Sequence, residues 1–211
     1  MKRRSFVELA ALGSTAFVAG CAQTQTQAQP QAAAGTCATD GTPNQFIPKK
    51  AADATPLVNE LTKYPRCPYC NMDRTQFHAS RMLIQYGDDL VDGTCSIHCA
   101  ALSLGLNIDR QPKTMWVGDN AAAGDVKPLV EVDKATFLVG SKIKGVMTQR
   151  SKVAYGDKAA AEASRKANGG ELVDFDQALA AAYADMSRDV SMIRKNREER
   201  RKRAAEQAKK S

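Results

Sequence analysis

Four of the six cysteines lie in two close pairs, and these pairs are the most reactive part of the sequence. The first pair frames Cys67-Pro68-Tyr69-Cys70, and the second pair, Cys95 and Cys99, encloses His98. Closely spaced thiols exchange electrons through a disulfide or bind a metal ion as thiolates, whereas a buried free thiol behaves as a small hydrophobic side chain. Each pair is therefore open to a redox, a metal-binding or a core-packing interpretation.

The redox interpretation rests on residues 67–70, because Cys-Pro-Tyr-Cys is the active-site sequence of glutaredoxins. In that fold the motif follows an apolar strand, but residues 61–66 here are polar and include Pro65. That fold also requires a cis-proline after a β-branched residue, and neither Pro112 nor Pro128 follows one. A thiol-disulfide oxidoreductase that uses Cys67 and Cys70 is thus kept as an alternative function.

Two kinds of metal site fit these residues. The two cysteine pairs together could form a structural four-cysteine zinc knot, although three residues rather than two separate Cys95 from Cys99. Met72 adds a thioether two residues after Cys70, and a thiolate with a thioether favours Cu(I) over Zn²⁺ because both ligands are soft. A methionine also commonly fills a gap in a hydrophobic core. Cys70 and Met72 are therefore candidate copper ligands, with zinc binding or core packing as alternatives.

The N-terminus has the pattern of an exported lipoprotein. Lys2-Arg3-Arg4, a mostly apolar stretch over 6–18 and the ending Val18-Ala19-Gly20-Cys21 predict a signal peptide over residues 1–20, with Cys21 as the site of lipid attachment. The paired arginines also resemble a twin-arginine export signal. Ala22, rather than an aspartate, follows Cys21, so we expect a periplasm-facing lipoprotein of the outer membrane.

Export would place the other cysteines in an oxidising compartment. Five remain after lipidation of Cys21, so at least one thiol must stay free, pair with another chain or bind a metal. The sequence leaves the disulfide state of Cys37, Cys95 and Cys99 open. Residues 21–60 are rich in Gln, Ala and Pro, which predicts a flexible tether between the lipid and the folded domain.

Residues 67–72 resemble the Cys-x-x-Cys-Gly-Met signature of the NosL copper lipoproteins, which are accessory proteins of nitrous oxide reductase. The resemblance covers roughly residues 62–180 as well as the lipobox. It departs from the family pattern at Asn71 and at Thr148, where glycine is usual, and in the basic tail. Further matching segments are Thr94-Cys95-Ser96, residues 115–119, residues 135–141 and Gly145-Val146-Met147.

The resemblance implies a Cu(I) site made by Cys70, Met72 and the distant Met147. Met147 rests on the resemblance alone, and Cys67 and His98 are possible further ligands. Asn71 can replace the family's glycine if its backbone is left-handed, a conformation that Asn tolerates better than most residues. The implied function is a Cu(I) metallochaperone whose partner is nitrous oxide reductase or its membrane assembly complex.

The pattern of strands, turns and helices predicts an α+β fold. A strand over 82–86, a turn, a return strand over 90–94 and a helix over 95–106 form one group. The sequence Tyr-Gly-Asp recurs 69 residues later, at 155–157, followed by a helix over 158–167 and a strand over 171–175. We therefore expect a domain over 61–180 made of two related units, 62–115 and 116–180, with the metal site at their junction.

In the helix over 95–106, Cys95, His98 and Cys99 stand at i, i+3 and i+4, so they share one helix face with Leu102 and Leu106. A core stripe is the simplest interpretation of that face. A disulfide between Cys95 and Cys99, or extra ligands near the copper, are the alternatives.

The net charge of +7 is concentrated at the two ends of the chain. Residues 9–184 are neutral, so no basic face for nucleic acid is expected. Residues 181–211 predict a basic helical or disordered tail, either solvated or in contact with anionic lipid or an acidic partner. Two histidines are few for acid–base catalysis, and no catalytic triad, phosphate loop or carboxylate pair is evident. The sequence therefore predicts a binding protein rather than an enzyme.

Overall fold

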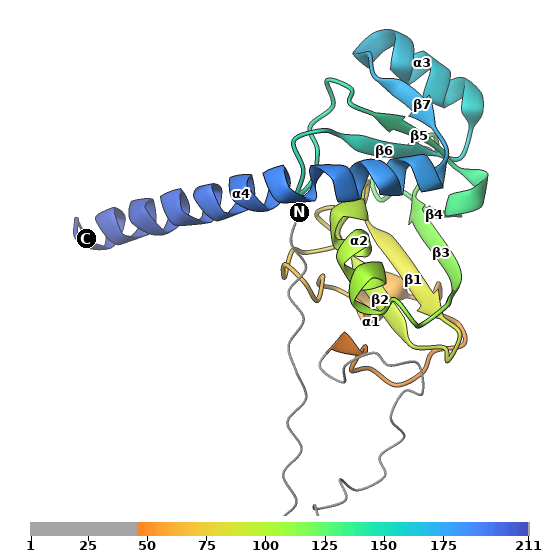
Figure 1. The fold of residues 1–211 in the computed structure, drawn as a ribbon, viewed down its shortest axis with the longest axis horizontal. Coiled ribbons are helices and arrows are strands. Elements are labelled where there is room, and N and C mark those ends of the chain that lie inside the picture. The colour runs from red at the N-terminus through yellow and green to blue at the C-terminus, as the bar shows by residue number, and fades with distance from the viewer. Residues whose placement is uncertain (1–45, 211) are drawn as a thin grey trace, which may run out of the picture. The chain divides into compact units, whose positions relative to one another are not determined.

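The computed structural model describes residues 46–210, which form an α+β fold with two antiparallel sheets (Figure 1). The predicted signal peptide, Cys21, Cys37 and most of the predicted tether lie outside this range. No described helix is both long enough and apolar enough to cross a membrane. The first sheet has the strand order β2-β1-β3-β4 and the second has the order β6-β5-β7.

The first sheet is built on β1 (Met82–Tyr86), which pairs with β2 (Val91–Thr94) on one side and with β3 (Pro112–Gly118) on the other. All five residues of β1 are buried because both faces of the sheet are covered. Side chains alternate between the faces of a strand. Met82, Ile84 and Tyr86 accordingly face a core with helix α2 (Ile97–Leu106), whereas Leu83 packs with Tyr64 and Trp116. The strand, turn and helix predicted over 82–106 are confirmed to within two residues.

The second sheet repeats the chain order of the first. Strand β5 (Thr136–Val139) is central, β6 (Lys152–Tyr155) and β7 (Glu171–Val173) flank it, and α3 (Lys158–Asn168) connects the two flanking strands. In the first unit β1 is likewise central, and α2 connects β2 to β3. Each unit is therefore a strand–strand–helix–strand motif. The predicted relation between two strand–helix units is visible in this topology.

The two Tyr-Gly-Asp sequences do not occupy equivalent positions in the two units. Tyr86 ends the first strand of its unit, but Tyr155 ends the second strand of its unit. The true counterpart of the Tyr155-Gly156-Asp157 turn is Thr94-Cys95-Ser96, which also joins a strand directly to the cap of a helix. Cys95 thus occupies the strand-to-helix turn of the first unit, where the second unit has Gly156.

The predicted boundary at residues 115/116 falls inside a strand. Met115, Trp116 and Val117 pair with β1, and Trp116 pairs on its other side with Glu131 of β4 (Leu129–Glu131). The first unit therefore extends through β4, and a short 3-10 turn (Val132–Lys134) leads into β5. One core cluster joins the two sheets, because it contains β1 and β3 residues together with Phe137, Val139 and Ala154.

The last helix, α4 (Phe175–Ala208), begins before the predicted tail. Asp174 caps it, since its side chain accepts a hydrogen bond from the backbone N–H of Gln177 at 2.8 Å, and its own backbone N–H donates to Oε1 of Gln177 at 3.3 Å. A strand through residue 175 was expected, but this capping box starts the helix there. The helix runs through residue 180, the expected end of the domain. Its early residues face the core, and they include Phe175, Ala178, Ala182, Asp185 and Asp189.

The far part of α4 is the predicted basic tail, which is helical. Residues 194–208 are all exposed, and Lys202 pairs with Glu198 at 2.7 Å, one turn away. The equivalent pairing of Glu199 with Arg203 is absent from the described contacts, because Arg203 donates instead to the carbonyl oxygen of Glu199. At the other end, Asp53 and Glu60 are attached to the domain. The fold therefore begins before residue 61, where the domain was expected to start.

Candidate metal centre

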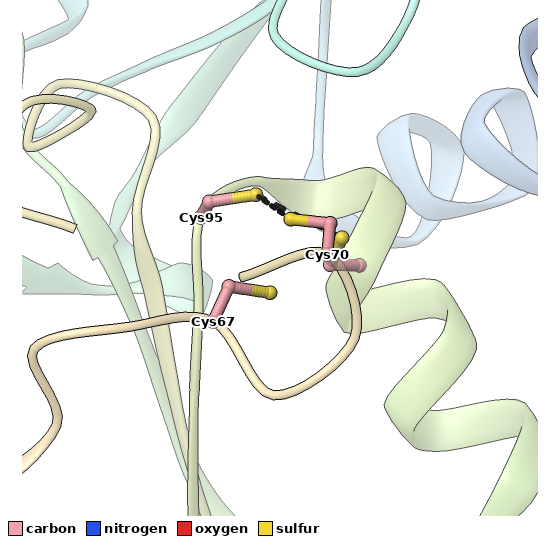
Figure 2. A group of neighbouring side chains, drawn as sticks. Cys67, Cys70 and Cys95 are labelled. Atoms are coloured by element: carbon pink, nitrogen blue, oxygen red, sulfur yellow. Dashed lines mark hydrogen bonds between the residues drawn. The ribbon is translucent and has the colours of Figure 1, made fainter. Parts of the chain in front are cut away.

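The four cysteines of the two pairs form one cluster, and Figure 2 shows Cys67, Cys70 and Cys95 of it. The Sγ atoms of Cys67, Cys70, Cys95 and Cys99 all lie within 4.8 Å of one another. The Sγ atom of Cys95 is 3.3 Å from that of Cys70 and 3.7 Å from that of Cys99. Cys70 is half-buried and the other three are buried, and all four are free thiols. The alternative of a disulfide between Cys95 and Cys99 is not the one that the structure adopts.

The segment 67–72 forms a tight loop that presents its sulfur atoms on one side. The backbone N–H of Cys67 donates to the carbonyl oxygen of Met72 at 3.0 Å, and that of Asn71 donates to Cys67 at 2.9 Å. Asn71 has φ 63°, the left-handed conformation that the sequence required of it. The loop lies in a turn rather than at the start of a helix. It therefore lacks the helix N-terminus that activates the first thiol of a glutaredoxin.

Arg74 holds this loop against the first sheet. The side chain is fully buried and pairs with Glu60 at 2.9 Å. Its guanidinium also donates to the carbonyl oxygens of Tyr64 at 2.5 Å, Met82 at 3.1 Å and Thr94 at 3.1 Å. Thr94 immediately precedes Cys95, so Arg74 connects the loop that carries Cys67 and Cys70 to the turn that carries Cys95.

Gly93 allows this close approach. A Cβ atom at residue 93 would lie 2.7 Å from the Cβ of Tyr64 and 2.8 Å from Nη1 of Arg74. Both distances are far shorter than normal contacts, so any larger residue here would collide with Tyr64 and with the guanidinium of Arg74. Sequence analysis did not identify Arg74 or Gly93 as positioning residues. A buried arginine leaves no periodic signal, because its partners here are mainly backbone carbonyls distant in the sequence.

Cys95 and Cys99 come from the start of α2, but only Cys99 is helical. Cys95 precedes Ser96, which is the extended cap residue, and the helix begins at Ile97. The hydroxyl of Ser80 donates to the carbonyl oxygen of Cys95 at 2.8 Å and fixes this turn. Of the expected helix face, Cys95, His98 and Cys99 are buried, whereas Leu102 and Leu106 are only half-buried. The stripe, however, faces other thiols rather than purely hydrocarbon side chains.

His98 lies outside the thiol group. Its side chain is buried, and its Nδ1 atom lies 3.6 Å from Oδ2 of Asp189 in α4. Burial lowers the pKa of His98, although the nearby Asp189 carboxylate opposes this shift. His98 therefore packs toward α4, and it is absent from the set of residues whose ligand atoms gather within 4.8 Å.

The thiols differ in acidity because each affects the others. Hydrogen bonds from Cys70, Cys95 and Cys99 lower the pKa of Cys67. The contact with Cys67 raises the pKa of Cys70, but contacts with Cys95 and Cys99 outweigh it and leave that pKa lowered. The pKa values of Cys95 and Cys99 are raised, first by their contact with Cys67 and then by that with Cys70. The 67–70 loop thus carries the more acidic thiols.

Two methionines pack against this cluster from opposite parts of the chain. Met72 ends the 67–72 loop, whereas Met147 lies in the segment between β5 and β6. Met147 has φ 60°, which is unusual for a long side chain and commonly marks a functional position. A Cβ at Gly145 would lie 2.5 Å from the carbonyl oxygen of Thr148, so this turn requires its glycine. The second unit thereby contributes Met147 to a site made mainly by the first.

The segment after Met147 is tied to α4. Asp185, which is buried, accepts hydrogen bonds from Lys152 at 2.9 Å and from Arg150 at 2.8 Å. The Lys152 side chain is 1% exposed, so this carboxylate neutralises a buried ammonium group.

The structure brings Cys67, Cys70 and Met147 together with Met72, Cys95 and Cys99. Which of these sulfur atoms bind a metal stays a prediction.

Comparison with known proteins identifies a related solved structure and a matching family. The crystal structure of the copper chaperone NosL from Shewanella denitrificans is 26% identical, covers 60% of this chain and 92% of its own, and has a TM-score of 0.45. A search of the curated proteins finds no match. The sequence model of the NosL family matches residues 58–183, which is more than half of the chain and contains all six clustered sulfur residues. The protein therefore belongs to the NosL family.

Proposed function

We propose that this protein is a lipid-anchored Cu(I)-binding metallochaperone of the bacterial cell envelope that delivers copper to nitrous oxide reductase. The observation that carries the proposal is the meeting of four thiols within 4.8 Å, with two methionines packed against them. Thiolate and thioether ligands together select a soft monovalent ion. The solved relative named above is described as a copper chaperone, which supports the same cargo.

Cys70, Met72 and Met147 are the proposed primary ligands, and Cys67 is a further candidate ligand beside them. Cys70 is half-buried, whereas Cys67, Cys95 and Cys99 are buried. A metal bound at Cys70 is therefore the one that an incoming ligand can reach. Transfer to a client needs such an opening, because the accepting ligand must attach before the last protein–copper bond breaks. His98 is directed to Asp189 and is not among the proposed ligands.

The membrane attachment and the client belong to the proposal. Cys21 would carry the lipid, and the residues that follow it would tether the domain to the membrane surface. An anchored chaperone stays close to a membrane-bound assembly complex, which raises its effective concentration there. Nitrous oxide reductase, or that complex, is the proposed recipient of the copper.

Zinc binding is the second candidate, because the zinc knot required the same four cysteines to meet. Structural zinc sites use four tetrahedral ligands at about 2.3 Å from the metal. The observed grouping of the thiols fits that requirement. The two methionines distinguish the candidates, since Zn²⁺ has little affinity for thioethers and Cu(I) binds them well.

Metal competition separates these candidates. The full chain, purified anaerobically under reducing conditions, is titrated with Cu(I) against a chromophoric chelator and separately with Zn²⁺. Tight Cu(I) binding that is lowered by at least about tenfold in Cys70→Ser supports the chaperone. Cys37→Ser is the matched control, because it removes a cysteine that belongs to neither of the two close pairs. Stoichiometric Zn²⁺ with no retained copper would overturn the copper proposal.

A further inference from the structure

The site contains more soft ligands than one Cu(I) ion uses. Four thiols lie within 4.8 Å of one another, and Met72 and Met147 pack against them. Cu(I) is satisfied by about two or three soft ligands. Cys70, Met72 and Met147 already provide such a set. Cys67, Cys95 and Cys99 are then left as a second set directly beside the first.

The spacing of the sulfur atoms allows them to be shared between ions. Two sulfur atoms bound to one ion at about 2.3 Å can be at most about 4.6 Å apart. The Sγ of Cys95 lies 3.3 Å from that of Cys70 and 3.7 Å from that of Cys99, well within this limit. Every other pair lies within 4.8 Å and needs only a small movement. Cys95 lies between the two sets and is placed to bridge them.

The charge of a fully ligated site also favours more than one monovalent ion. Four thiolates around a single Cu(I) would leave three uncompensated negative charges, and three of the four side chains are almost fully buried. Uncompensated buried charge is costly. Arg74 is the buried cation that interacts with Cys67, but it is already paired with Glu60 at 2.9 Å. Each additional Cu(I) removes one negative charge without needing another protein cation.

We propose that this cluster binds a pair of Cu(I) ions, one at Cys70, Met72 and Met147 and one held deeper by Cys67, Cys95 and Cys99, with Cys95 bridging. The inference rests on the proposed function, because it assumes that Cu(I) is the cargo. Each thiol that still carries a proton loses its S–H bond, forms an S–Cu bond and releases the proton to solvent. Copper stays Cu(I) throughout, so no electron is transferred and no oxidant is required.

The stoichiometry of binding tests this inference. The full chain, reduced and kept free of oxygen, is titrated with Cu(I) and examined by native mass spectrometry. We expect about two ions per chain in the parent and in Cys37→Ser, the matched control. The double variant Cys95→Ser/Cys99→Ser should bind one ion, and it should keep the site at Cys70.

X-ray absorption of the parent provides a readout that needs no variant. Two ions joined by a bridging thiolate give copper–copper scattering at short distance, whereas separate ions do not. Its presence supports the pair even if the double variant fails to fold, which circular dichroism would reveal.

The outcomes separate the inference from the function on which it rests. One Cu(I) in the parent, without copper–copper scattering, overturns the pair and leaves the chaperone proposal in place. Two ions that persist in a folded double variant also overturn it, since the second ion then lies elsewhere. Failure to bind Cu(I) at all, or binding of Zn²⁺ alone, overturns the proposed function itself.

Discussion

The backbone N–H of Gln149 donates a hydrogen bond to Oδ1 of Asp189 at 3.1 Å, and this contact fastens the segment after Met147 to the middle of α4. The other carboxylate oxygen of Asp189 faces His98 of α2, the helix that carries Cys99. One side chain of α4 therefore lies against both the segment that follows Met147 and the helix that carries Cys99. The first half of α4 is part of the site's framework.

Asp185 should be essential for stability. Replacing Asp185 by Asn removes the charge that neutralises Lys152, whose side chain is 1% exposed. An unpaired buried charge typically costs about 3 kcal/mol or more. We expect a loss of this size in the free energy of unfolding of the metal-free protein, measured with urea. Arg188→Ala is the control, because that side chain pairs with the same carboxylate but is 72% exposed and should change stability by under about 0.5 kcal/mol.

The same carboxylate predicts how stability depends on pH. Burial raises the pKa of Asp185, but hydrogen bonds from Arg150 and Lys152 outweigh burial and leave the pKa below its ordinary value of 3.8. A lowered folded-state pKa gives stability that is complete above the ordinary pKa and is lost as pH falls through the folded-state pKa. The free energy of unfolding of the parent should therefore decrease as the pH falls from neutral to below this ordinary value of 3.8. The free energy of unfolding of Asp185→Asn should change less over the same pH range. An equal change in the parent and the variant would show that Asp185 does not cause the loss.

Met147 should affect copper binding more than stability. Met147→Leu keeps the volume and removes the sulfur, so the metal-free protein should lose under about 1.5 kcal/mol. Cu(I) should be held more weakly, with fewer sulfur neighbours in the X-ray absorption spectrum. Met186→Leu is the matched control, since Met186 packs against the main core. If Met147→Leu binds as the parent does and His98→Ala loses the ion, the site is built on α2 instead.

Asn71 should tolerate glycine but not a β-branched residue. With φ 63° at this position, Asn71→Gly relieves strain and should change stability by under about 1 kcal/mol. Asn71→Val should cost about 1–3 kcal/mol, because a branched side chain is strained in the left-handed region. The loop that carries Cys70 and Met72 would distort, and Cu(I) affinity should fall in the valine variant only. Chelator competition measures both variants against the parent.

The lipid anchor can be tested without the metal. Cys21→Ser should leave the protein unacylated and release it from the membrane fraction, as measured by mass spectrometry and fractionation. Cys37→Ser, also outside the described residues, should remain attached. A Cys21→Ser protein that still sediments with membranes would point to the basic end of α4 as a second attachment.

Local patterns predicted much of this fold. The mostly apolar run over 82–86 located β1. The helix predicted over 158–167 is α3, which ends at Asn168 with Gly169 as its cap at φ 69°. The start of α4 was missed because Phe175 extends the apolar pattern of β7. The hydrogen bonds between Asp174 and Gln177 instead stabilise the start of a helix at this point. Residues 174–175 could either extend strand β7 or start a helix. Only the packing of α4 in the folded protein shows that they start the helix.

The site was partly predictable for a related reason. Cys67, Cys70 and Met72 are close in sequence, so their chemistry could be inferred from spacing. The approach of Cys95 and Cys99 to that loop depends on Arg74 and Gly93, whose contacts are distant in sequence. The zinc alternative required this approach and the copper alternative did not. Sequence alone therefore could not establish how many thiols the site contains.

Helix α4 is continuous, so it fixes the distance between its two ends. No glycine or proline interrupts its 34 residues, so the exposed stretch over 194–208 extends rigidly for about 22 Å at 1.5 Å per residue. Because the first half is fastened to the framework of the site, the positive charges beyond it are carried at a set distance from the copper ligands. An acidic surface that bound those charges would therefore be held in a defined position and orientation relative to the sulfur cluster.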